Sequence, residues 1–161
     1  MKQRLKIGLD FHGVINRHPE FFSGFCNEAL RRGHEIHILT GGPENVVSEM
    51  LRQYKVPYSK LFAILDFYEQ TGKVTHYANG EFKVEDKLWN RAKAEYCLAN
   101  GINLHIDDSS LYGVWFQTPF CRYDGERSEC VMPSSYKIDL RTSPSLALDQ
   151  IEELLKTTQY F

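Results

Sequence analysis

The sequence predicts an α/β protein, a three-layer α/β/α sandwich around a mostly parallel sheet with a small β-hairpin insertion. Short apolar runs alternate with stretches of helical spacing along most of the chain. Gly33 directly follows the helical stretch at residues 20–32, as expected of a glycine at a helix C-terminus. Acidic or hydroxyl side chains follow three of the apolar runs, where open α/β sheets place their ligands.

The first half of the chain predicts three strands separated by helices. Residues 5–10 form a buried run that ends in an aspartate, and residues 20–32 place apolar side chains at helical intervals. Residues 34–40 alternate in polarity, which is typical of a strand. A helix is expected to begin near Pro43, because proline suits a first helical turn. Residues 61–67 predict a third parallel strand.

The second half predicts a hairpin, two further strands and two helices. Residues 73–83 contain an Asn-Gly pair between two short β-like runs, which favours a hairpin. Residues 86–99 predict a helix capped by Asp86. Strands are expected at residues 102–106 and 114–118, and a last helix after Ser143.

Composition points to one globular domain spanning residues 1–161. A net charge of -2 gives no reason to expect general affinity for nucleic acid. Apolar runs fall short of the roughly 18–20 residues that a membrane helix needs. The first run is interrupted by Lys6 and Asp10, so it predicts a strand and not a signal peptide. We therefore expect a cytoplasmic protein without membrane contact.

The four cysteines show no metal-binding spacing. Cys26 and Cys97 lie among helical apolar positions, which predicts burial. Cys121 and Cys130 could form a disulfide across a hairpin, although free thiols are favoured for a cytosolic protein.

Polar side chains end three of the predicted strands: Asp10, Thr40, and the pair Asp107 and Asp108. Each alone is more often a turn or cap residue. Parallel strands bring their C-terminal ends to one edge of the sheet, so these groups are expected to meet in one crevice. Carboxylates gathered there would suit Mg²⁺, which accepts a few carboxylates and substrate phosphate.

The order of these segments resembles the haloacid dehalogenase-like (HAD) superfamily of hydrolases. Four motifs match in order: residues 9–15, residues 36–41, a lysine near a helix start, and residues 104–108. The resemblance covers residue 5 to about residue 110. It implies a Rossmann-like HAD fold and a Mg²⁺-dependent phosphatase that works through an aspartyl-phosphate.

The resemblance also implies roles for the acidic residues. Asp10 would be the nucleophile and a metal ligand. The backbone carbonyl of His12 and the carboxylate of Asp108 would complete the metal site, with Asp107 assisting.

Further roles follow for the second motif and for the lysine. Thr40 would donate its hydroxyl to a phosphoryl oxygen, with Gly41 and Gly42 binding the same group. The lysine would neutralise negative charge, and Lys87 is preferred over Lys83. Lys93 is expected deeper in the helix, on a solvated face.

His12 departs from the superfamily pattern, which has a second aspartate at this position. That aspartate protonates the leaving group and then activates water. Imidazole is a competent acid and base, so His12 is expected to replace it with a shifted pH optimum. The alternative is a slow site, or one that only binds.

The gaps between motifs hold no separate cap domain, so the site is expected to be open or covered only by the hairpin. The predicted partner is a phosphorylated substrate: a small molecule, a nucleotide or a nucleic-acid end. Two other functions remain open. One is a metal-dependent nuclease in which water attacks directly, and the other is a HAD-like binding protein with weak or no catalysis.

Overall fold

The computed structural model describes residues 3–125, 129–131 and 136–158. A seven-stranded sheet runs through the protein in the order β3-β2-β1-β6-β7-β8-β9. The first five strands in this order are parallel, and the last two pair antiparallel. Their bounds are Lys60–Ala63 (β3), Glu35–Thr40 (β2), Lys6–Asp10 (β1), Leu104–Asp107 (β6), Phe120–Asp124 (β7), Glu129–Val131 (β8) and Lys137–Asp139 (β9). The predicted mixed α/β class with a mostly parallel sheet is confirmed.

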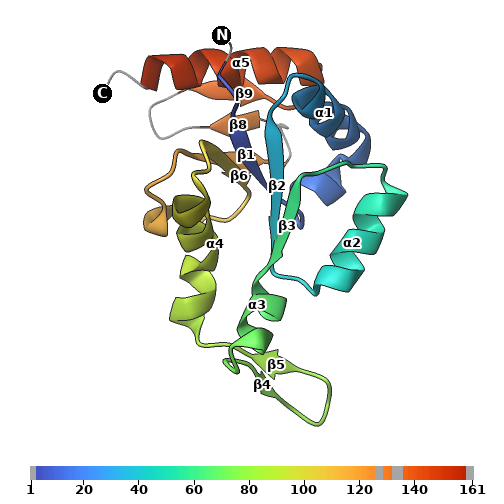
Figure 1. Ribbon diagram of the computed structural model, residues 1–161, viewed down its shortest axis with the longest axis vertical. Helices are drawn as coiled ribbons and strands as arrows, with labels where there is room; N and C mark the ends of the chain where they lie inside the picture. The colour runs from blue at the N-terminus through green and yellow to red at the C-terminus, as the bar shows by residue number, and fades with distance from the viewer. Residues whose placement is uncertain (1–2, 126–128, 132–135, 159–161) are drawn as a thin grey trace.

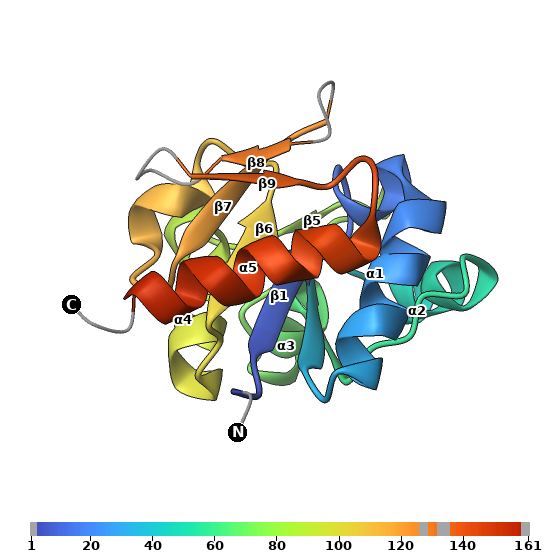
Figure 2. The ribbon, with the colours of Figure 1, turned by 90° about the horizontal axis from the view of Figure 1, so that it is seen from above.

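Helices cover both faces of the sheet. The larger apolar core joins the strands to three helices, α1 (Pro19–Arg31), α2 (Glu44–Gln53) and α5 (Pro144–Thr158). Figure 2 shows the start of α5 beside α1. Helix α4 (Asp86–Asn100) packs with β2 through a second core that includes Leu39 and Cys97. Among helices of the described residues, none is long and apolar enough to cross a bilayer.

A polar cluster anchors α5 to the rest of the molecule. Arg32, just after α1, forms ion pairs with Asp149 and Glu152 of α5. His34 accepts the Leu5 N–H at Nδ1 and donates from Nε2 to Glu152. These bonds hold α5 against the N-terminal end of β1.

The predicted hairpin forms, but it is short. Strands β4 (Thr75–His76) and β5 (Phe82–Lys83) pair antiparallel around the Asn-Gly turn. Figure 1 shows this hairpin beyond α3 and α4, at the lower end of the molecule. Both strands are exposed.

One strand prediction is too long, and another is wrong. Within residues 61–67, the strand ends at Ala63 and the chain turns into α3 (Ile64–Gln70), because Ile64, Leu65 and Tyr68 form a buried helical face. Residues 114–118 do not form a strand. A 3₁₀ helix, η2 (Tyr112–Trp115), occupies this region, and its apolar Val114 is 81% exposed.

The cysteine predictions are partly right. Cys26 and Cys97 are buried free thiols, as expected. Cys121 is disulfide-bonded, so the preference for a free thiol is wrong at this position. The side chain of Cys130 lies outside the described part of the chain.

Candidate active site

Two buried carboxylates lie where the direction of the sheet connections reverses. The chain passes from β1 to β2 and β3 on one side and later returns to β6 and β7 on the other. Asp10 ends β1 and Asp107 ends β6, and these neighbouring strands are in parallel register. Such a reversal is where open α/β sheets bind ligands.

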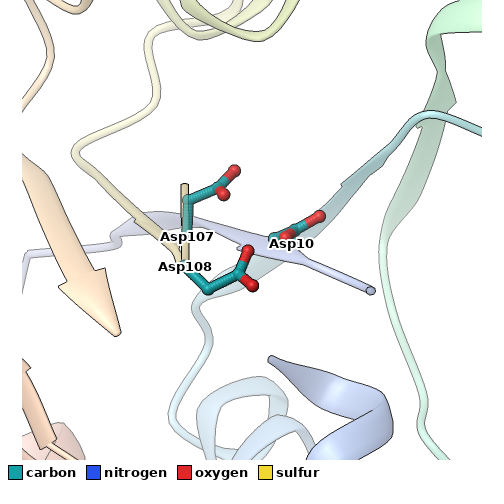
Figure 3. Close-up of side chains that lie close together, drawn as sticks. All are labelled: Asp10, Asp107 and Asp108. Atoms are coloured by element: carbon teal, nitrogen blue, oxygen red, sulfur yellow. The ribbon is translucent and has the colours of Figure 1, made fainter. Parts of the chain in front are cut away.

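Asp108 completes an acidic cluster at this edge. Carboxylate oxygens of Asp10, Asp107 and Asp108 all lie within 4.8 Å of one another. Figure 3 shows the three side chains gathered at the ends of the two strands. Asp10 is 5% exposed and Asp107 is fully buried, whereas Asp108 is exposed to solvent. The cluster therefore has a buried floor and an open side.

Lys93 of α4 joins the two buried carboxylates. Its Nζ donates to Asp10 Oδ1 and to Asp107 Oδ2, each at 2.8 Å, and its side chain is 4% exposed. Burial disfavours the ammonium charge, but the two carboxylates outweigh burial and raise the pKa of Lys93. Burial also acts against the Asp107 charge, yet Lys93 and His105 hold the pKa of Asp107 well below its ordinary value. Lys93 and Asp107 therefore form a stable charged pair.

Asp10 experiences the opposite balance. Burial raises its pKa well above the ordinary value, Lys93 only partly offsets this, and the neighbouring Asp107 and Asp108 raise it further. When all three carboxyls are ionised, they and the Lys93 ammonium carry two negative charges in total, which is the state that burial of Asp10 disfavours. A divalent cation would neutralise this excess, and oxygen ligands suit Mg²⁺. The residues present therefore fit a Mg²⁺ ion.

Asp107 is also held from behind. His105 donates from Nε2 to Asp107 Oδ2 at 2.9 Å, and the Ser109 N–H donates to Asp107 Oδ1 at 3.0 Å. The imidazole stacks on Phe116 with 5.2 Å between ring centroids. A side chain at Gly8 would place its Cβ 2.6 Å from His105 Nδ1, so β1 needs glycine here. These contacts orient Asp107 toward Lys93.

Thr40 and His12 lie side by side. Thr40 ends β2 and is fully buried, and its Oγ1 accepts the Gly42 N–H at 3.3 Å. Its hydroxyl lies 3.5 Å from Nδ1 of His12, which is exposed. Burial and the charge of Lys93 lower the pKa of His12, while Asp108 opposes them. His12 therefore holds its proton less tightly than a free imidazole does.

Two glycines shape the loops around these groups. Gly13 has a φ of +87°, and a Cβ there would lie 2.0 Å from Asp108 Oδ2. Gly41 is in contact with the indole of Trp89, which a Cβ would approach to 2.9 Å. Asp108 and Trp89 therefore keep their positions only because Gly13 and Gly41 carry no side chain.

The helix that the sequence predicts near Pro43 follows the loop after Thr40. Helix α2 does begin at Glu44, directly after Pro43. The Glu44 N–H, however, already donates to Asp66 Oδ1 at 2.8 Å. Part of this helix terminus is therefore capped from within the protein.

The preferred lysine is not the one that reaches the carboxylates. Lys87 is exposed, and among the described interactions none joins it to the acidic cluster. Lys83 is exposed and pairs with Asp86 at 3.6 Å. The expected solvated face for Lys93 is wrong, because α4 turns this residue into the sheet. The spacing to Cys97, four residues later and predicted to be buried, could have indicated this.

Comparison with known proteins adds no family assignment. No family model matches the chain, and no curated protein matches it.

Proposed function

We propose that this chain is a Mg²⁺-dependent phosphomonoester hydrolase with a HAD-like fold, in which Asp10 forms an aspartyl-phosphate. The observation that carries the proposal is the pairing of Lys93 with Asp10 and Asp107 beside Asp108. An arrangement of this kind positions a carboxylate nucleophile and compensates the charge of a phosphoryl group.

Asp10, Asp108 and the backbone carbonyl of His12 would hold the Mg²⁺ ion, which would supply positive charge for the nucleophile and the phosphoryl oxygens. Lys93 adds a fixed ammonium on the buried side of Asp10. Thr40 would orient the phosphoryl group with its hydroxyl. Asp107 keeps Lys93 charged and in place.

The reaction has two steps, phosphoryl transfer to Asp10 and hydrolysis of the aspartyl-phosphate. A carboxylate oxygen of Asp10 attacks phosphorus, the bond from phosphorus to the leaving oxygen breaks, and the fraction of His12 that carries a proton gives it to that oxygen. Water then attacks phosphorus and gives a proton to His12, while the bond from phosphorus to Asp10 breaks. Inorganic phosphate leaves, and both residues return to their starting forms.

A phosphomonoester screen with Mg²⁺, run beside Asp10→Asn and His12→Asp, tests the proposal. Wild type is expected to release phosphate, and Asp10→Asn is expected to lose at least 10³-fold in rate, as is typical when a nucleophile is removed. Equal activity in Asp10→Asn would contradict the covalent route. Absence of turnover by both wild type and His12→Asp would favour a binding protein.

A further inference from the structure

An aromatic wall leads away from the acidic cluster, formed by Tyr112, Trp89 and Phe82. The Tyr112 ring lies 5.2 Å from Lys93 Nζ, the ammonium that contacts Asp10. Trp89 Nε1 donates to the Tyr112 hydroxyl at 3.2 Å. Phe82, on the hairpin, lies 5.9 Å from Trp89 between ring centroids. The wall thus extends from the reacting groups to the hairpin.

The wall is positioned by the site itself. Ser109 donates its N–H to Asp107 and accepts the Tyr112 N–H at 3.2 Å on its hydroxyl. The carboxylate that pairs with Lys93 thereby also sets the turn that carries Tyr112. On the other side, Trp89 packs directly against Gly41, in the loop that follows Thr40. The Trp89 indole therefore contacts two residues beside the reacting groups, Tyr112 and Gly41.

These three side chains are not closed into the core. Phe82 is 42% exposed, and Tyr112 and Trp89 are half-buried. A planar ring placed against such faces gains stacking energy whatever its hydrogen-bonding pattern. Trp115 lies in the same 3₁₀ helix as Tyr112 but is not part of the wall, because its ring lies against Arg91.

We propose that the aromatic wall binds a planar aromatic or heteroaromatic ring in the leaving group of the substrate, while Asp10 receives the phosphoryl group. The inference rests on the proposed phosphatase function and names its substrate class. Two sources share this chemistry: an aryl phosphate such as phosphotyrosine, and a nucleoside monophosphate. The hydrophobic and π character of the wall selects the ring, and Lys93 keeps the phosphoryl end beside Tyr112.

Phosphate release with Mg²⁺ from three probes tests this inference: phenyl phosphate, adenosine 5′-monophosphate and glycerol 2-phosphate. At least one ring-bearing probe is expected to exceed glycerol 2-phosphate in kcat/KM by about tenfold, within the range of one stacking contact. Preference for phenyl phosphate would indicate the aryl source, and preference for the nucleotide the other.

Substitution of Trp89 separates recognition from loop support. Trp89→Leu is expected to lower kcat/KM for the preferred ring-bearing probe about tenfold more than it lowers kcat/KM for glycerol 2-phosphate. Trp89→Phe keeps a ring and should retain the preference, and Trp115→Leu should not alter it. Equal losses for all probes in Trp89→Leu, or no preference in wild type, would overturn the inference while leaving hydrolysis intact.

A binding measurement covers the case in which no probe is hydrolysed, which would contradict the proposed function. Trp115→Phe leaves Trp89 as the sole tryptophan, and Asp10→Asn in the same chain prevents turnover. A ring-bearing phosphate is expected to quench the fluorescence of Trp89 saturably in Mg²⁺, and glycerol 2-phosphate is not. Absence of quenching by both ring-bearing probes would overturn the inference.

Discussion

Replacing Lys93 with methionine should destabilise the protein strongly, because it leaves two buried carboxylates without their cation. Lys93 donates to both Asp10 and Asp107 at 2.8 Å and is almost completely buried. Removing one member of a buried ion pair costs about 3–5 kcal/mol. We expect a loss of that size in the free energy of unfolding, measured by urea denaturation near neutral pH with a chelator present.

The cost should depend on pH with a definite sign. In wild type, the depressed pKa of Asp107 contributes stability above the unfolded value near 3.9, and this contribution is lost as pH falls through the folded pKa. In Lys93→Met, burial without a counter-charge raises the pKa of Asp107, so protonation relieves the strain as pH falls. The stability gap between the two proteins should therefore be largest near neutral pH and shrink toward about pH 4.

Lys87 provides a matched control on the same helix. It is exposed at the start of α4, so Lys87→Met should change the free energy of unfolding by less than about 0.5 kcal/mol. The buried ion pair would have no stabilising role if Lys93→Met were as stable as Lys87→Met near neutral pH, or if its stability gap to wild type stayed constant as pH falls.

Three further predictions concern the supports of the site and of α5. Gly13→Ala should cost about 1–2 kcal/mol in unfolding free energy from its positive φ alone and weaken Mg²⁺ binding in calorimetry, because its Cβ collides with Asp108; unchanged Mg²⁺ affinity would contradict this. His105→Leu should lower kcat more than His105→Gln, which can still donate to Asp107; equal kcat values would rule out this positioning role. Burial disfavours the charge of Glu152, but hydrogen bonds from His34 and Arg32 lower its pKa. Glu152→Gln should therefore be less stable than wild type at neutral pH, and the difference should shrink as acid protonates the carboxyl of the wild type. A difference that widens in urea titrations at acid pH would contradict this role of Glu152.

The strand ends could be predicted because their signal is local. An apolar run followed by Asp10 or by Asp107 needs no knowledge of tertiary contacts, and the parallel topology then brings the two together. The false strand at residues 114–118 shows the limit of this approach. Val114 and Trp115 lie on the surface at the end of η2, Phe116 packs against His105, and the true strand β7 begins at Phe120.

Lys93 could not be identified from its residue type, because most lysines are exposed. Its burial depends on two carboxylates from strands that are distant in sequence, with Asp10 lying 83 residues away. Helical spacing to Cys97 was the one local signal for it. The aromatic wall was equally hidden, because the contacts among Phe82, Trp89 and Tyr112 join the hairpin, helix α4 and the 3₁₀ helix η2.

Trapping the covalent intermediate tests the central claim most directly. The protein would be mixed with Mg²⁺ and a phosphomonoester that it hydrolyses, quenched in acid and reduced with borohydride, which converts an aspartyl-phosphate into homoserine. Peptide mass spectrometry is expected to find homoserine at position 10, and none in Asp10→Asn or without substrate. Turnover that leaves Asp10 unmodified, with Asp10→Asn still active, would contradict the account.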